Sequence, residues 1–338
     1  MNANLSSIAD ESAVRNAKPI DMHVHIVGNG TGGTGCWMRL SGLHRPMSWF
    51  MLRHIGLPID SLKGDLDRLY VERLLELVRT SSLGRIVILA HEQVYDDRGR
   101  LMEGVGSVYV PNDYVLKLAR ENPEFLPAVS IHPARVDALD ELDRCIAEGA
   151  VLLKCLPNCQ NIDCNDRRYT RFWERMAEKK LPLLAHTGGE HTVPVVRKEL
   201  ASPQTLELPL DCGVTVIAAH SGTKSGLFDP DYFSVFAKMT QRYPRLYGDN
   251  SAFNTPFRGS HIPECLQSPL SERMVCGSDF PVPIYAKWAR MRGYISSEQY
   301  KKWRNHPNNL ERDYQLKRAI GFSEECFTRI HNLLRIEK

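Results

Sequence analysis

Short apolar runs rich in β-branched residues alternate with longer amphipathic segments along most of this chain. The runs are Pro19–Val27, Arg85–His91, Phe125–His132, Ala150–Leu156, Leu181–His186, Val214–His220, Arg245–Ser251 and Arg273–Asp279. The segments between the early runs carry apolar residues at three- and four-residue spacing, which is typical of helices with one buried face. A strand followed by a helix, repeated eight times, predicts a parallel (β/α)8 barrel, the TIM-barrel architecture. An open doubly wound sheet is less favoured, because no glycine-rich phosphate-binding sequence follows any run.

Two segments depart from a plain barrel. A long insertion, about residues 28–63, separates the first strand from its helix; it begins GNGTGGTG and then becomes aromatic and basic. Because glycine gives the backbone wide freedom and loops commonly carry function, we expect this insertion to form a lid over the barrel mouth. The tail from Asn308 onwards predicts a C-terminal helical cap. With no linker or repeat in between, residues 1–338 are expected to form a single domain.

Composition and charge limit the kind of partner. The chain is 43% hydrophobic and 25% charged, with a formal net charge of +3 and no run of Lys or Arg, which argues against nucleic acid. The N-terminus is polar, and no apolar stretch reaches the ~20 residues that a membrane-spanning helix needs. The nine cysteines include one cluster, Cys155, Cys159 and Cys164, whose spacing does not match a zinc knuckle. We therefore expect a soluble cytoplasmic protein with reduced thiols and a small-molecule substrate, and homo-oligomers remain open.

Polar side chains stand at or near the ends of most of the predicted strands. They are His23, His25, His91, His132, Lys154, His186, His220, Asp249 and Asp279. The carboxyl ends of barrel strands meet at one mouth, where barrel enzymes carry their chemistry. One histidine in such a place is usually structural, but several converging on one rim indicate a metal centre. His23 and His25 are two residues apart on a strand, so both imidazoles are expected to face the same side.

Several segments that carry these residues resemble a known family. The segments are DMHVHIVGNG, AVLLKCLPNCQNID, LPLLAHTGGEH, VIAAHSG, VCGSDFPVP and the final GFSEECFTRIHNLLRI. In them the chain resembles the amidohydrolase superfamily, and within it amidohydrolase family 2. That branch includes metal-dependent hydrolases, hydratases, lactonases, and decarboxylases related to aminocarboxymuconate-semialdehyde decarboxylase. The resemblance runs from about Pro19 to the end and is weakest in the insertion.

The resemblance implies a set of metal ligands and catalytic groups. His23, His25 and His186 match ligands of one or two divalent ions, with zinc the expected metal. Asp279 matches an aspartate that contacts the metal and takes a proton from bound water. His220 matches a histidine that binds metal in some relatives and acts as acid or base in others. Lys154 matches a lysine that is carboxylated in two-metal relatives, where the carbamate bridges the two ions. In one-metal relatives an unmodified lysine or another residue takes this place. Alternatively, Lys154 is an ammonium group that binds a substrate carboxylate.

The implied function is hydrolysis by metal-activated water, with Asp279 as general base and His220 orienting the water or stabilising the oxyanion. The insertion's Trp37, Trp49 and Phe50 could cover a cyclic or aromatic substrate. An arginine could bind its carboxylate, the candidates being Arg39, Arg45, Arg53 and Arg258. The ligand set does not separate hydrolysis from metal-dependent decarboxylation, and a metal-free lactonase-like activity is a further alternative.

Overall fold

A parallel sheet of eight strands lies at the centre of the computed structural model, which describes residues 17–40, 42 and 44–336. The strands follow one another in chain order and each pairs in parallel with the next. They are β1 (Ile20–His25), β3 (Arg85–Leu89), β5 (Phe125–Val129), β6 (Leu152–Cys155), β7 (Leu183–His186), β8 (Val216–Ala219), β9 (Leu246–Asp249) and β10 (Met274–Val275). Each lies within one of the predicted runs.

Hydrogen bonds between the first and last strands close the sheet. The Met22 amide donates to the Cys276 carbonyl (3.1 Å), and the His25 amide donates to the Phe280 carbonyl (2.8 Å). The sheet is therefore a barrel, which confirms the predicted fold and excludes the open doubly wound sheet. Inside it, apolar side chains such as Ile20, Leu89 and Ile217 form a packed core, as expected of a barrel interior.

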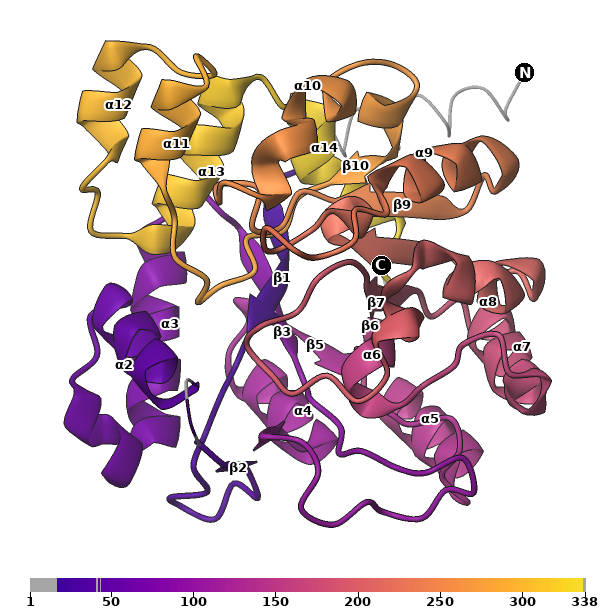
Figure 1. The fold of residues 1–338 in the computed structure, drawn as a ribbon. Helices are drawn as coiled ribbons and strands as arrows, with labels where there is room; N and C mark the ends of the chain where they lie inside the picture. Colours follow the sequence, from indigo (N-terminus) through magenta and orange to yellow (C-terminus); the bar gives the residue numbers. More distant parts are fainter. Residues whose placement is uncertain (1–16, 41, 43, 337–338) are drawn as a thin grey trace, which may run out of the picture.

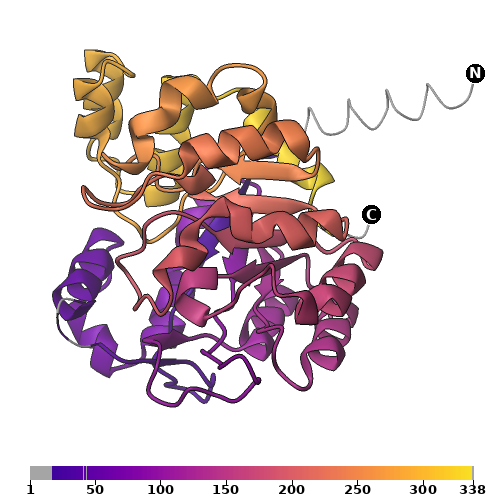
Figure 2. The ribbon, with the colours of Figure 1, turned by 45° about the vertical axis from the view of Figure 1, so that its right-hand side comes forward.

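Helices surround the barrel, as the ribbon shows from two directions (Figures 1 and 2). Their amphipathic sequences explain this position, because the apolar side of each helix packs against the outer face of the strands. Those that follow the successive strands are α3 (Leu66–Arg79), α4 (Asn112–Glu121), α5 (Ala138–Ala147), α6 (Pro157–Gln160), α7 (Thr170–Glu178), α8 (Glu207–Asp211), α9 (Phe233–Arg242) and α10 (Ile262–Cys265). After β10 come α11 (Ala286–Met291), α12 (Ser297–Trp303), α13 (Asn309–Ile320) and α14 (Glu324–Thr328), so the predicted C-terminal helices are present.

The insertion after β1 has a structure of its own. It contains the short strand β2 (Trp37–Met38) and the helix α2 (His44–His54), and β2 pairs antiparallel with β4 (Val108–Tyr109) from the loop after β3. The glycine-rich start is held by the buried carboxylate of Asp67, which accepts from the amides of Asn29 (2.6 Å) and Gly30 (3.2 Å). The insertion is therefore fastened to the barrel near its start and again at β2.

Two further expectations concern membrane-spanning helices and disulfide bonds. In the described part of the chain, no helix has both the length and the apolar character needed to cross a membrane. All nine cysteines are free, and Cys155, Cys159 and Cys164 are buried without forming a disulfide. The assignment of residues 1–338 to a single domain stays a prediction, and residues 1–16 lie outside the described part.

Candidate metal centre and active site

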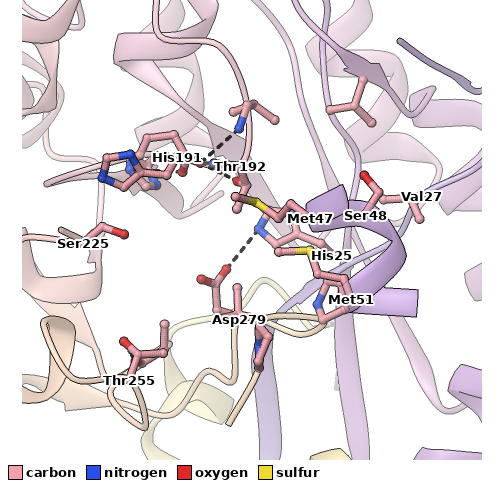
Figure 3. Close-up of a pocket in the computed structure, with 18 of the residues that line it drawn as sticks. His25, Val27, Met47, Ser48, Met51, His191, Thr192, Ser225, Thr255 and Asp279 are labelled. Atoms are coloured by element: carbon pink, nitrogen blue, oxygen red, sulfur yellow. Dashed lines mark hydrogen bonds and ion pairs between the residues drawn. The ribbon is translucent and has the colours of Figure 1, made fainter. Parts of the chain in front are cut away.

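The predicted site residues come together at the carboxyl ends of the strands. His23 lies on β1, and His220 and Asp279 follow β8 and β10. One ligand atom from each of these three residues lies within 4.8 Å of the others, an arrangement that could hold a metal ion. His25 joins them, with its Nε2 atom 3.3 Å from Nε2 of His23 and 3.2 Å from Oδ1 of Asp279 (Figure 3). Their roles as ligands and catalytic groups stay predictions.

An irregularity in β1 determines which way its histidines face. Asp21 pairs with Ile86 and Val24 pairs with Ile88, so two residues of β1, Met22 and His23, lie opposite a single residue of β3. Met22 points into the barrel core, and a regular strand would turn His23 outward. The bulge shifts the alternation by one residue, which turns His23 and His25 toward the mouth. Bulges commonly aim a side chain in this way beside active sites.

The remaining predicted residues lie at different distances from this cluster. His186 ends β7 with its ring centroid 4.9 Å from that of His220, and its buried Nε2 atom has no hydrogen-bond partner among the described residues. Lys154 is buried, with Nζ 3.4 Å from Nε2 of His23. His91 lines the pocket described below, whereas His132 is buried beside Tyr95.

Hydrogen bonds set the tautomers of two histidines. Nδ1 of His23 lies 2.7 Å from a carboxylate oxygen of Asp249, which only accepts, so Nδ1 carries the proton. Nδ1 of His220 lies 2.7 Å from the Ser251 hydroxyl oxygen and 3.2 Å from the Ser251 carbonyl oxygen. The hydroxyl donates its proton to Asp249, so both oxygens accept from Nδ1 and the tautomer is the same. Both rings therefore turn the lone pair of Nε2 toward the site. Metal-binding histidines have this arrangement, with the second ring nitrogen donating to a carboxylate or carbonyl group.

Asp249 connects the two histidines. Besides holding the ring of His23, its other oxygen accepts from the His220 amide (2.7 Å) and from the amide and hydroxyl groups of Ser251. Burial alone would raise the pKa of Asp249, but the hydrogen bonds and charges of its neighbours hold it well below its ordinary value. The sequence places Asp249 at a strand end but indicates no role for it. Its role as a support depends on which rings approach it, and no sequence pattern shows that.

The charge states of the cluster suit a divalent cation. Burial, together with Lys154, lowers the pKa of His23 to about 4, and burial lowers that of His186 to about 3. These rings are therefore neutral at pH 7 and have lone pairs available. Burial alone would raise the pKa of Asp279, but the adjacent histidines hold it well below its ordinary value, so the group is anionic. Neutral imidazoles with one carboxylate are the ligands that zinc and similar ions take. The donor set thus fits the predicted metal.

The backbone is unusual at the two groups proposed for catalysis. Asp279 has φ of 64° and His220 has φ of 59°, in the left-handed region that costs about 1–3 kcal/mol for residues other than glycine. A buried network under the β10 end holds this geometry. Nζ of Lys317, on α13, donates to the Gly277 carbonyl (2.5 Å) and to Asp313 (2.6 Å). The C-terminal helix thus supports the segment that carries Asp279.

A pocket of about 590 Å³ opens above the cluster. Its polar floor consists of His25, His91, His186, Glu190, His220, Arg258 and Asp279. The insertion supplies an apolar wall, with Met38, Leu40, Met47, Phe50 and Met51 among its members. Of the predicted lid aromatics, Phe50 borders the pocket, whereas Trp37 stacks with Arg39 and Tyr109. The aromatic segment therefore lies at the mouth as predicted, while the glycine-rich start packs beside Asp67.

Two charged residues complete the floor. Arg258 is buried, and its guanidinium donates to the carbonyl groups of Thr223 (3.1 Å) and Gly189 (2.7 Å). Of the four arginines considered for substrate binding, this is the one that lines the pocket. Glu190 was missed; its Oε2 atom lies 3.6 Å from Nε2 of His186. The signal was its place in the loop directly after the His186 strand.

Comparisons with known proteins agree with this architecture. A family model described as Amidohydrolase matches residues 20–301. Among solved structures, an uncharacterised TIM-barrel protein of Bordetella bronchiseptica is 17% identical, with a TM-score of 0.58 over 89% of this chain and 99% of that one. The 5-carboxyvanillate decarboxylase of Sphingomonas paucimobilis is 10% identical, with a TM-score of 0.52 over 95% and 99%. No curated protein matches the chain at a significant level of similarity.

Proposed function

The chain belongs to the amidohydrolase family, and on that premise we propose that it is a metal-dependent hydrolase of a small, carboxylate-bearing cyclic or aromatic substrate. The observation that carries the proposal is the cluster of His23, His220 and Asp279, whose ligand atoms lie within 4.8 Å of one another. Both histidines turn an unprotonated Nε2 into this cluster. A purely structural set of histidines would need no such orientation.

We assign the ligands of one divalent ion to His23, His25, His186 and Asp279, with zinc as the first candidate. The buried Nε2 atom of His186 has no hydrogen-bond partner among the described residues, and the Glu190 carboxylate lies 3.6 Å away. This supports its inclusion, because a buried polar atom without a hydrogen bond is costly unless a ligand satisfies it. His220, 4.0 Å from Asp279, can act either as a fifth ligand or as a contact to bound water. Lys154 as a bridging carbamate stays a prediction. Its Nζ lies 3.4 Å from Nε2 of His23, the atom that faces the cluster, so binding of a substrate carboxylate by an unmodified Lys154 stays the alternative.

The residues divide the chemistry among them. A bound divalent ion lowers the pKa of water in its shell toward neutrality. Asp279, anionic and beside that position, accepts the proton of the attacking water and returns it to the leaving group. His220 lies where its ring stabilises the negative charge that develops on the substrate oxygen. Arg258 is the buried cation of the pocket floor and pairs with the substrate carboxylate.

Decarboxylation is the second candidate, because a 5-carboxyvanillate decarboxylase shares this barrel over nearly the whole chain. In that reaction Asp279 or His220 would give a proton to the substrate carbon as carbon dioxide leaves. The products separate the two candidates: hydrolysis of aryl esters and lactones releases acid without carbon dioxide, whereas decarboxylation of hydroxybenzoates releases it.

The deciding experiment begins with metal analysis of protein purified without chelator. Turnover is then measured on both substrate classes before and after chelation and after readdition of Zn²⁺ or Mn²⁺. We expect about one ion per chain and loss of turnover on chelation, with recovery on readdition. Full turnover by protein shown to be free of metal would refute the proposal and favour the metal-free lactonase-like alternative.

A further inference from the structure

The two halves of the pocket differ sharply in chemistry. The floor carries the charged residues Arg258, Glu190 and Asp279. The wall formed by the insertion is largely apolar, with Met38, Leu40, Met47, Phe50 and Met51, and later loops add Val193, Phe257, Val282 and Pro283. The polar residues outside the floor include Ser48, Ser107, His191, Thr192, Ser225 and Thr255. Figure 3 shows Met47 and Met51 on the same pocket as His25 and Asp279. A molecule that fills this pocket is therefore matched best when it is charged at the end that meets the floor and apolar along the side that meets the methionines.

The size of the pocket argues against a single-ring acid as the whole occupant. Its volume of about 590 Å³ falls in the range of roughly 300–1,000 Å³ that encloses drug-sized ligands. A one-ring acid held between Arg258 and the histidines would cover the floor and leave the methionine wall in contact with water. Covering an apolar surface is favourable because water is released from it, so the exposed part of this wall contributes to binding only when the substrate carries an apolar group that reaches it.

Three methionines in one wall also indicate the kind of apolar group. Met38, Met47 and Met51 come from β2 and α2 of the insertion. Methionine is unbranched and polarisable, and its side chain adapts to partners of different shape. A rigid, planar partner would be better served by aromatic or branched residues, which hold fixed shapes. The wall suits a flexible chain.

We propose that the substrate is an amphipathic acid, with its anionic group against Arg258, its reacting bond above the histidine–aspartate cluster, and a flexible alkyl or alkenyl substituent along the methionine wall. This inference rests on the proposed function for the position of the reacting bond, and it adds the apolar substituent as a requirement for recognition. The methionines select for the presence and length of this substituent and tolerate differences in its shape.

A binding experiment tests the inference without turnover. The metal-loaded protein is titrated calorimetrically with benzoate and with 4-ethyl-, 4-butyl- and 4-hexylbenzoate. Burial of one methylene group is worth about 0.8 kcal/mol, so we expect affinity to rise by about threefold to fourfold per methylene until the wall is covered. The neutral 4-hexylbenzamide should bind at least about tenfold more weakly than 4-hexylbenzoate, since a hydrogen-bonded charge pair with Arg258 is lost.

Variants of Met47 and Met51 test whether the alkyl substituent contacts the methionine wall. The double substitution Met47→Gln with Met51→Gln should flatten the dependence of affinity on the length of the alkyl substituent. Met47→Leu with Met51→Leu, which keeps the wall apolar, should retain the dependence. Met291→Gln is the matched control, because Met291 is 71% exposed and lies on α11 outside the pocket lining. Melting temperatures establish that each variant is folded.

Each result bears on one claim. Equal affinities across the alkyl series, or an unchanged dependence in the folded glutamine variant, would overturn the amphipathic substrate. If the metal-loaded wild type hydrolyses none of the substrates but its affinity still rises with the length of the alkyl substituent, the proposed reaction is overturned and this inference stands. If the wild type hydrolyses short aryl esters but its affinity does not depend on the length of the alkyl substituent, the proposed reaction stands and this inference is overturned.

Discussion

Replacement of Asp249 by asparagine tests whether the support of the histidines is what makes the site able to bind metal. Asparagine has nearly the same size, and its carbonyl oxygen can still accept from the His220 amide as Oδ1 does now. Its amide nitrogen, placed where Oδ2 meets Nδ1 of His23 at 2.7 Å, can only donate. His23 must then move its proton to Nε2 or leave a buried N–H group unpaired. In the first case the lone pair that should face the metal is gone.

The expected loss follows from this geometry. Removing a group that orients a metal-binding histidine typically costs about 10- to 100-fold in metal affinity or activity. That range equals about 1.4–2.7 kcal/mol of binding free energy. We expect Asp249→Asn toward the upper end, because Asp249 supports His23 through its ring and His220 through its backbone.

The assay measures metal affinity directly. Metal-free wild type and Asp249→Asn compete for Zn²⁺ with a chromophoric chelator, and melting temperatures are recorded with and without the ion. Wild type should gain more thermal stability from Zn²⁺ than the variant does, because stabilisation by a ligand grows with its affinity. Asp67→Asn is the control: Asp67 is also a buried carboxylate, but it holds the insertion, so its loss should lower stability and leave metal affinity unchanged. If Asp249→Asn is folded and binds Zn²⁺ as tightly as wild type, the argument from tautomers is wrong.

Three further predictions concern single residues. Asp279→Asn should lower turnover by at least about 10²- to 10⁴-fold while the protein stays folded; near-normal turnover at normal metal content would remove Asp279 from the chemistry. His220→Gln should retain most of the metal and lose turnover if His220 contacts bound water, and metal analysis showing loss of the ion would make it a ligand instead. Burial lowers the pKa of His132 to about 4, below the ordinary 6.5. As pH falls from about 6.5 to 4, the imidazole of His132 is protonated in the unfolded chain but stays neutral in the folded protein. The free energy of unfolding therefore decreases over this interval. The melting temperature of His132→Gln should therefore fall less steeply than that of wild type over this interval, and parallel curves would contradict the assignment.

The barrel and most of its site could be predicted because both depend on local patterns. Strand length and apolar composition place His186, His220 and Asp279 at the ends of strands, and the closure of the barrel brings strand ends together. The same reasoning placed His23 and His25 on one side of a strand, but it did not show the bulge. A bulge depends on pairing with β3, and no feature of β1 alone specifies it.

Most of what was not predicted depends on contacts between distant segments. Asp249 acquires its importance from His23 and His220, which lie on or after other strands. Glu190 is the exception, because it follows His186 by four residues in the loop after β7. The glycine-rich stretch suggested a mobile lid, but a single carboxylate, Asp67 on the following helix, binds its amides. In the aromatic segment, composition indicated a wall for an aromatic substrate. In the structure methionines form much of that wall and Trp37 packs elsewhere.

The contacts of α13 have a consequence for the order in which the molecule matures. On the ribosome the strand that carries His23 is made early, whereas the segment of Asp279 depends on Lys317, which follows it by a whole helical region. Until Asn309–Ile320 has been synthesised and has packed against Gly277, the segment that leads from β10 to Asp279 lacks its contact with Lys317. A nascent chain that stops before this helix would contain every proposed metal ligand in its sequence and still have no assembled site. Acquisition of the metal is therefore expected to follow the synthesis and packing of α13.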